Sequence, residues 1–162
     1  IGKKLSNVLK IPFKDSDFEI EKKFNASISS IFESSGEFTF REAEADIILE
    51  IIKKPPVILS TGGGAFCNPK IRSKILKTSI SIWLDAKPEN ILGRIKNFST
   101  RPLLSGDNPL NRLKKLSNER KNIYKKATTC IKTDHLGIEE ITNNILIFLN
   151  KIKYIKSNTC LE

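Results

Sequence analysis

The run at residues 57–65, Val-Ile-Leu-Ser-Thr-Gly-Gly-Gly-Ala, constrains this chain most, because apolar strand-forming residues stop at three consecutive glycines. Gly62, Gly63 and Gly64 leave the backbone without side chains where the predicted strand ends. A ligand with polar groups can approach bare N–H groups closely there, and glycine clusters are typical of the carboxyl ends of parallel strands. A flexible turn would contain the same residues, so the run by itself leaves both interpretations open.

Strand-like and helix-like segments alternate along the chain, which predicts an α/β fold with a parallel sheet and helices on both of its faces. Besides the glycine-terminated strand, strands are expected at residues 11–14, 79–84 and 128–132. Helices are expected at residues 1–9, 19–23, 27–35, 37–53, 91–95, 110–125 and 137–153. A further helix begins at Pro69, after the cap residue Asn68.

The length and composition fit one globular domain spanning residues 1–162. Within it, the polar loop at about residues 97–109 has the length of a lid, and residues 154–162 are expected to form a frayed tail. No apolar run reaches the roughly 18 to 20 residues of a membrane span. The three cysteines are far apart and lack metal-ligand spacing, so neither a disulfide framework nor a zinc site is expected.

A formal net charge of +10 raises the question of nucleic-acid binding. The lysines are spread over the whole chain, which indicates a solvated surface, and no nucleic-acid-binding signature accompanies them, so we rank that function last. Arginine is the more informative cation, because its planar guanidinium group binds carboxylates and phosphates through two hydrogen bonds. Only six arginines accompany the 22 lysines, so the surroundings of each arginine are informative.

Charged residues accompany the strand ends and the loop in a pattern that indicates phosphoryl transfer. Asp15 and Asp17 follow one predicted strand, Arg101 lies in the polar loop, and Arg41 and Arg120 lie on predicted helices. The carboxyl ends of parallel strands meet at one crevice, where cations and backbone N–H groups would hold phosphates. The two aspartates could serve Mg²⁺ and a polyhydroxylated substrate.

Each of these residues also has a simpler interpretation. Asp15 and Asp17 could be turn and helix-cap residues. Arg41 and Glu44, three residues apart, could be an exposed helix pair. Arg120 taken alone would be a surface residue, and arginine is common in loops such as the one that contains Arg101. The combination of residues, rather than any single one, favours a site.

Five short motifs occur in a fixed order along nearly the whole chain. They are Asp-Ser-Asp at residues 15–17, Phe-Arg-Glu-Ala-Glu at 40–44, Thr-Gly-Gly-Gly-Ala at 61–65, Arg-Pro-Leu-Leu at 101–104, and Glu-Arg at 119–120 followed by Tyr124. Together they resemble the shikimate kinases, a family of the nucleoside-monophosphate-kinase-like branch of P-loop folds. Gluconate kinases share the core and the lid, but the Phe-Arg-x-x-Glu segment together with the triple glycine resembles shikimate recognition.

The resemblance implies transfer of the ATP γ-phosphate to the 3-hydroxyl of shikimate, a step of chorismate and aromatic amino acid biosynthesis. The implied substrate-binding residues are Asp17, Arg41, Gly62, Gly63, Gly64 and Arg120, with the two arginines gripping the carboxylate. Asp15 would act near Mg²⁺, through water, and would help to orient or deprotonate the attacking hydroxyl. Arg101 would close with the lid onto the nucleotide and neutralise the transferred phosphoryl group.

Four further residues acquire candidate roles from the resemblance. Phe32 and Phe40 would wall the substrate pocket, although phenylalanine is more often a core residue. Glu44 would hold Arg41 in position. His135 falls near the place of an adenine-contacting side chain in the family, but the local match is loose and a surface histidine is the simpler interpretation.

The family pattern differs at the start of the chain. Shikimate kinases begin with a strand and a Gly-x-x-Gly-x-Gly-Lys-Ser/Thr loop that binds ATP, whereas residues 1–5 resemble the helix that follows this loop. We therefore expect a truncated chain whose first, central strand is missing between the strands that end at Gly62 and Leu84. Such a chain would be poorly folded and would not turn over ATP. A non-catalytic homologue that only binds a small anion is the alternative.

Shikimate and ATP, with Mg²⁺, are the expected ligands, and the protein is expected to be a monomer. Neither a nucleic acid nor a membrane is expected as a partner. The cytoplasm is the default compartment, and a plastid is the alternative.

Overall fold

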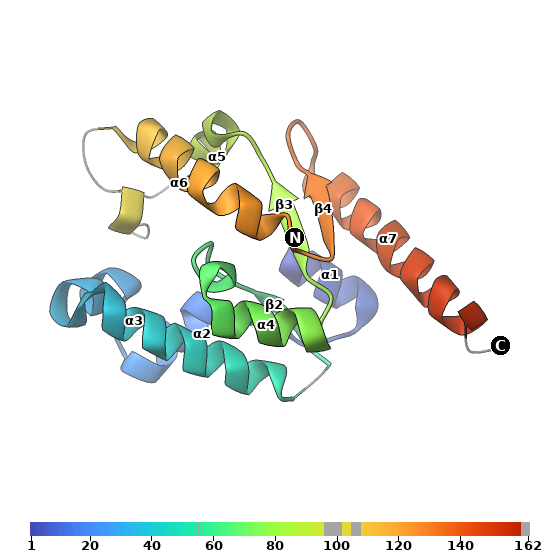
Figure 1. The fold of residues 1–162 in the computed structure, drawn as a ribbon, viewed down its shortest axis with the longest axis horizontal. Helices are drawn as coiled ribbons and strands as arrows, with labels where there is room; N and C mark the ends of the chain where they lie inside the picture. Colours follow the sequence, from blue (N-terminus) through green and yellow to red (C-terminus); the bar gives the residue numbers. More distant parts are fainter. Residues whose placement is uncertain (55, 96–101, 105–107, 160–162) are drawn as a thin grey trace.

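The computed structural model describes residues 1–54, 56–95, 102–104 and 108–159, with only the backbone described at residues 102 and 153–159. Helices and strands alternate along it (Figure 1). In chain order they are α1 (Gly2–Leu9), β1 (Phe13–Asp15), α2 (Ser16–Phe24), α3 (Ile28–Ile52), β2 (Ile58–Ser60), η1 (Ala65–Cys67), α4 (Pro69–Thr78), β3 (Ile82–Asp85), α5 (Pro88–Arg94), η3 (Pro102–Leu104), α6 (Pro109–Tyr124), β4 (Thr129–Lys132) and α7 (Ile138–Thr159), where η marks a 3₁₀-helix.

The strands pair in parallel, as the sequence predicts, but in two separate pairs. β1 runs beside β2 with Asp15 opposite Ser60, and β3 runs beside β4 with Asp85 opposite Lys132. No ladder joins β2 to β3 among the residues that the structure describes. The division of the sheet therefore falls between the two strands that were expected to be inner ones.

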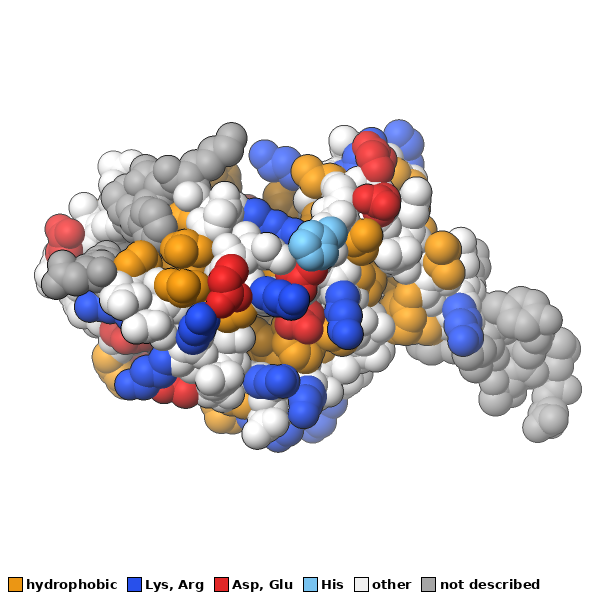
Figure 2. Space-filling model, turned by 90° about the horizontal axis from the view of Figure 1, so that it is seen from above, with side chains coloured by type: hydrophobic (Ala, Val, Ile, Leu, Met, Phe, Trp, Pro, Cys, Tyr) orange, Lys and Arg blue, Asp and Glu red, His pale blue; other side chains and the backbone are white. Residues whose placement is uncertain are grey.

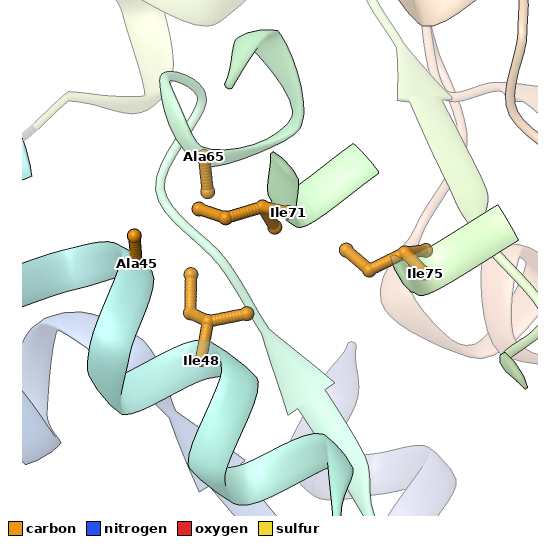
Figure 3. Packing of buried hydrophobic residues seen from close by; sticks show 5 residues of the cluster. All are labelled: Ala45, Ile48, Ala65, Ile71 and Ile75. Atoms are coloured by element: carbon orange, nitrogen blue, oxygen red, sulfur yellow. The ribbon is translucent and has the colours of Figure 1, made fainter. Parts of the chain in front are cut away.

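Helices cover both faces of the sheet, and two neighbouring residues of β2 show it. Ile58 packs on one side, in a cluster formed by α1, β4 and α7, and Leu59 packs on the other side, against α3, η1 and α4 (Figure 3). The buried residues of the first cluster are Leu5, Ile131, Ile141 and Ile145; those of the second are Ala45, Ile48, Ala65, Ile71 and Ile75. Since successive strand residues point to opposite faces, this is the three-layer α/β arrangement that the sequence predicts.

α3 contains a kink where the sequence predicts a break. Gly36 has a φ of 76° and a ψ of 169°, which is far from helical geometry and accessible mainly to glycine. The two predicted helices, at residues 27–35 and 37–53, are therefore two parts of α3 that meet at Gly36. Behind the kink, Ile20, Ile31, Phe40 and Ile47 form a third buried cluster, which joins α2 to both parts of α3.

Polar caps and prolines fix the beginnings of several helices. The Asn68 side chain accepts hydrogen bonds from the N–H groups of Lys70 and Ile71, and Pro69 takes the first position of α4, as predicted. Asn108 caps α6 in the same way, and Pro88 begins α5. These local signals set where the helices start, so they also set the helical phase of the side chains that follow.

The structure describes part of the predicted lid and part of the predicted tail. Most of the predicted lid, residues 97–109, lies outside the described residues; within it the structure describes η3, whose Leu104 is buried, and Asn108 and Pro109 at the start of α6. α7 continues to Thr159, beyond the helix end predicted at residue 153 and into the predicted tail at 154–162.

The surface is basic but mixed. On the face shown in Figure 2, Lys and Arg side chains are interspersed with Asp and Glu side chains rather than gathered into one continuous patch. Within the described part of the chain, no helix is both long enough and apolar enough to cross a membrane.

Candidate active site

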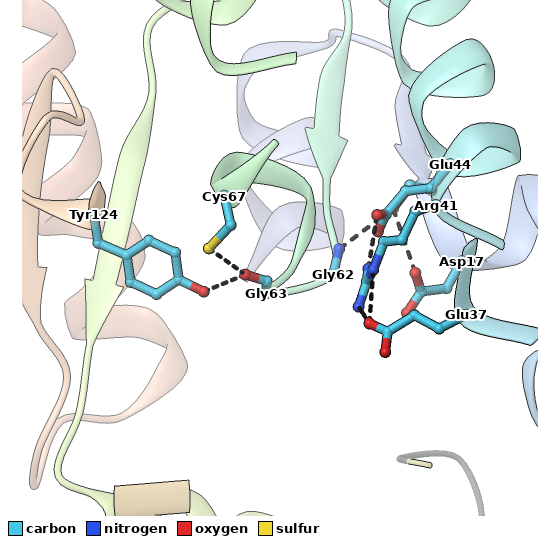
Figure 4. A network of polar contacts seen from close by, with 9 residues as sticks. Asp17, Glu37, Arg41, Glu44, Gly62, Gly63, Cys67 and Tyr124 are labelled. Atoms are coloured by element: carbon cyan, nitrogen blue, oxygen red, sulfur yellow. Dashed lines mark hydrogen bonds and ion pairs between the residues drawn. The ribbon is translucent and has the colours of Figure 1, made fainter. Parts of the chain in front are cut away.

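The three glycines form a tight turn at the carboxyl end of β2 (Figure 4). The carbonyl of Gly62 accepts a hydrogen bond from the N–H of Ala65 at 3.2 Å, which makes Gly63 and Gly64 the central residues of a β-turn. The N–H of Gly62 donates to Oγ of the fully buried Ser16, at 3.4 Å. This bond ties the turn to the start of α2, so Asp15 and Asp17 lie beside the glycines.

Each glycine leaves space for a different charged group. A Cβ atom on Gly62 would lie 3.2 Å from Asp17 Oδ1 and 3.4 Å from Glu44 Oε1, and one on Gly63 would lie 2.9 Å from Arg120 Nη1. A Cβ atom on Gly64 would lie 2.6 Å from Cζ of Arg41. The structure thus brings Asp17, Arg41 and Arg120 of the predicted site together around one turn.

Arg41 is held by two carboxylates of its own helix. Its Nη1 donates to Glu44 Oε2 at 2.7 Å, and its Nε and Nη2 donate to Glu37 Oε1 at 3.2 Å. Burial acts to lower the pKa of Arg41, but the hydrogen bonds and charges of Glu44 and Glu37 outweigh it, so the net shift is upward. The guanidinium group therefore stays charged and oriented without a ligand.

Phe40 is a buried residue that packs against Arg41 and does not line an open pocket. Its ring is buried in the α2–α3 cluster, is tilted by 42° against the Phe32 ring with centroids 4.6 Å apart, and lies 5.1 Å from Cζ of Arg41. The core interpretation of Phe40 is therefore the one that its burial supports, with a cation–π contact to the site residue above it.

Glu44 is the most unusual group of the site, because its carboxylate is 1% exposed and only half satisfied. Oε2 accepts from Arg41, whereas Oε1 has no hydrogen-bond partner among the described residues. Burial raises the pKa of Glu44; Arg41 acts in the opposite direction and the charge of Asp17 adds to the rise. Glu44 was expected to position Arg41, and their contact is present.

Asp15 caps α2, as its simpler interpretation predicts. Its Oδ1 accepts from the N–H groups of Asp17, at 3.0 Å, and Phe18, at 3.4 Å. Oδ1 alone makes both bonds, so the cap leaves Oδ2 of the same carboxylate as a further acceptor. The described residues contain no group of three or more His, Cys, Asp or Glu side chains that could enclose a metal ion. One carboxylate oxygen suits Mg²⁺, which retains several waters and binds through one or two carboxylates together with phosphates.

α6 presents Arg120 and Tyr124 to the other side of the turn. The two residues are four apart and therefore share one helix face. The Tyr124 hydroxyl donates to the Gly63 carbonyl, and the Cys67 thiol approaches the same oxygen at 3.8 Å. The sequence pattern contained Tyr124 without assigning it a role; its spacing from Arg120 was the available signal.

Of the remaining arginines, Arg112 is exposed on α6 and Arg101 lies outside the described residues. Arg72 donates to the carbonyls of Phe66 and Cys67, and Arg94 donates to Thr133 at the end of β4, so both act in the backbone framework. His135 is exposed, as its simpler interpretation predicts.

A parallel α/β sheet with a glycine turn, paired carboxylates and two converging guanidinium groups at its strand ends defines a phosphotransferase of the P-loop kinase-like class. The shikimate kinase family model matches residues 1–150. The chain belongs to the shikimate kinase family.

Individual relatives agree with this assignment. Shikimate kinase of Bartonella quintana is 39% identical over 158 residues, which cover 98% of this chain and 75% of that protein. The Bartonella henselae enzyme is 38% identical over 146 residues, 90% of this chain and 70% of its own length. Among solved structures, shikimate kinase from Acinetobacter baumannii in complex with shikimate aligns with a TM-score of 0.90 and 33% identity over 94% of this chain and 86% of that one. The Aquifex aeolicus enzyme aligns with a TM-score of 0.80 and 36% identity over 92% of this chain and 87% of its own.

Proposed function

We propose that the complete protein transfers the γ-phosphate of ATP to the 3-hydroxyl of shikimate. The observation that carries this proposal is the convergence of Arg41 and Arg120 on the bare turn at Gly63 and Gly64. Two guanidinium groups beside unobstructed backbone N–H groups form a site for a small carboxylate. Family membership and the shikimate complex of the Acinetobacter baumannii relative support shikimate as that carboxylate.

Two arginines bind the carboxylate of the substrate, and Asp17 binds its ring hydroxyls. Arg41, already oriented by Glu44 and Glu37, and Arg120 hold the carboxylate from two sides of the turn. Asp17 lies beside Gly62, where its carboxylate accepts hydrogen bonds from the ring hydroxyls. Helices and the sheet register fix the positions of these groups, so the 3-hydroxyl is presented in one orientation. This reduces the entropy that is lost in reaching the transition state.

Asp15 is the candidate residue for contacting the reacting hydroxyl and Mg²⁺. Its backbone cap holds the carboxylate at the end of β1, in a position to orient the hydroxyl or to accept its proton. Asp15 would hold Mg²⁺ through water, and the ion would neutralise phosphate charge. Arg101 is proposed to contribute a second positive charge to the transferred phosphoryl group.

Two measurements on the purified complete protein test the proposal. Calorimetry with shikimate reports binding, and a coupled assay reports ADP release with shikimate or, as the competing substrate, gluconate. Saturable shikimate binding with shikimate-dependent ADP release is expected. Binding without turnover would refute the kinase, and faster ADP release with gluconate would refute the substrate.

Arg120→Lys connects this function to the site. Lysine keeps the charge but loses the planar pair of donors, so the Kd for shikimate should rise about tenfold or more. Arg112 lies exposed on the same helix and provides the matched control, because Arg112→Lys should leave the Kd unchanged. Equal affinities of the two variants would contradict the placement of the carboxylate.

The proposed assembly is a monomer in the cytoplasm, with shikimate and ATP as its ligands, and size-exclusion chromatography with light scattering tests the oligomeric state.

A further inference from the structure

Tyr124 is half-buried, and its hydroxyl donates to a carbonyl outside its own helix. Its ring packs between Trp83 of β3, at 5.7 Å between centroids, and Phe66 of η1, at 6.5 Å. Burial raises the pKa of Tyr124, although Arg120 acts against the rise, so the hydroxyl keeps its proton through the neutral range. The group is therefore a permanent donor, and its acceptor is the carbonyl of Gly63, 61 residues away in the sequence.

The position of that carbonyl decides which way the next N–H points. Gly63 and Gly64 are the two central residues of the turn, and the peptide between them contains the Gly63 carbonyl and the Gly64 N–H. In a trans peptide these two groups point in opposite directions. With the carbonyl held toward Tyr124 and Cys67, the Gly64 N–H points to the opposite face of the turn, away from α6. In the described part of the chain, this N–H has no acceptor.

Such a peptide has two accessible orientations when both central residues are glycines. Type I and type II turns differ by a flip of the central peptide, and type II requires a positive φ at the third residue, which glycine adopts without cost. Gly64 has a φ of −80° and a ψ of −29°, which corresponds to type I. Within the segment, the Gly64 carbonyl accepts from the Cys67 N–H at 3.0 Å as η1 begins, which favours the type I orientation, and the Tyr124 hydroxyl adds a contact from α6 to the same orientation.

We propose that Tyr124 is a positioning residue for substrate binding: its hydroxyl helps to hold the Gly63–Gly64 peptide in the type I orientation, which keeps the Gly64 N–H available to an oxygen of the ligand that Arg41 binds. The inference rests on the proposed function and assigns a further determinant of shikimate affinity. The adjacent placement of Arg120 strengthens it, since a Cβ atom on Gly63 would lie 2.9 Å from Arg120 Nη1 and 3.0 Å from the Tyr124 oxygen. One face of α6 therefore positions the Arg120 guanidinium group and also orients the Gly63–Gly64 peptide.

Tyr124→Phe removes the donor and retains the ring between Trp83 and Phe66. The Kd for shikimate should rise about 3- to 10-fold, the amount expected from one neutral hydrogen bond, while the KM for ATP stays unchanged. Cys67→Ala removes the weaker donor to the same carbonyl and should raise the Kd less. Thr142→Val, which deletes a buried hydroxyl that donates to a carbonyl within α7, is the control and should not change the Kd.

A spectroscopic measurement separates positioning from a general loss of stability. In ¹⁵N–¹H spectra the Gly64 amide of the wild type should shift when shikimate is added. In Tyr124→Phe the amide should start at a different position or be broadened by exchange, and its response to shikimate should be smaller. Wild-type affinity and a wild-type Gly64 response in Tyr124→Phe would refute the inference and leave the proposed function intact. A wild-type protein that binds no shikimate would overturn both.

Discussion

Gly64→Ala is the substitution whose effect follows most directly from the geometry of the site. Alanine can adopt the backbone conformation of Gly64, with φ −80° and ψ −29°, so the turn itself is not strained. The added Cβ atom, however, would lie 2.6 Å from Cζ and 2.8 Å from Nη2 of Arg41. The guanidinium group is the far end of a flexible side chain, so it moves aside, and the movement disturbs its 2.7 Å contact with Glu44.

The magnitude follows from the interaction that Arg41 would lose. A hydrogen bond to a charged group contributes about 1.5–3 kcal/mol, which corresponds to a rise of about 10- to 150-fold in the Kd for shikimate. The displaced guanidinium also leaves the buried Glu44 carboxylate without its partner. The free energy of unfolding should therefore fall by about 1–3 kcal/mol as well.

Calorimetry with shikimate and urea denaturation measure the two effects. Gly93→Ala is the matched control, since a Cβ atom on Gly93, inside α5, would meet nothing within 4 Å. It should leave the Kd unchanged and either preserve or slightly increase stability, because alanine favours a helix over glycine by up to about 1 kcal/mol. A Gly64→Ala variant with a Kd within twofold of the wild type would refute the argument that the missing side chain makes room for Arg41.

Two more predictions concern the carboxylates. Burial raises the pKa of Glu44 above its ordinary value of 4.5. The folded protein therefore binds the Glu44 proton more tightly than the unfolded chain does. As a result, the free energy of unfolding should decrease as pH rises from 4.5 through the folded-state pKa. Urea denaturation at several pH values should show this slope in the wild type and a weaker slope in Glu44→Gln; equal slopes would contradict it. Asp15→Asn keeps a side-chain oxygen for the Asp17 and Phe18 N–H groups, so stability should change by less than about 0.5 kcal/mol, while kcat should fall about 10²- to 10⁴-fold if the carboxylate accepts the proton. Near-normal kcat with intact stability would exclude that role.

Much of the local structure was predictable because it depends on short-range chemistry. Asn68 followed by Pro69 begins α4, Gly36 interrupts α3, and the apolar run before Gly62 is a parallel strand. These features arise from residues close together in the sequence, through caps, fixed dihedral angles and side-chain periodicity. The order of the five motifs was also sufficient to predict the family to which the chain belongs.

The roles of individual side chains depended on contacts between distant segments. The sequence could not choose between a cap and a ligand for Asp15, and the structure shows the cap while leaving one oxygen available. Likewise, the structure shows that Phe40 is buried and that its ring contacts the guanidinium group of Arg41. Periodicity tells which face of a helix a residue occupies, but it does not say what packs against that face.

Only the tertiary structure showed why three glycines are needed. The glycines accommodate charged groups from three helices: carboxylates of α2 and α3 at Gly62, Arg120 of α6 at Gly63, and Arg41 of α3 at Gly64. The Tyr124 hydroxyl, from the same helix as Arg120, donates to the carbonyl of the central peptide of this turn. The sequence by itself determined that the strand would end in bare backbone. Which side chains approach that backbone was decided by the packing of α3 and α6 around the sheet, because such contacts exist only once distant segments are brought together.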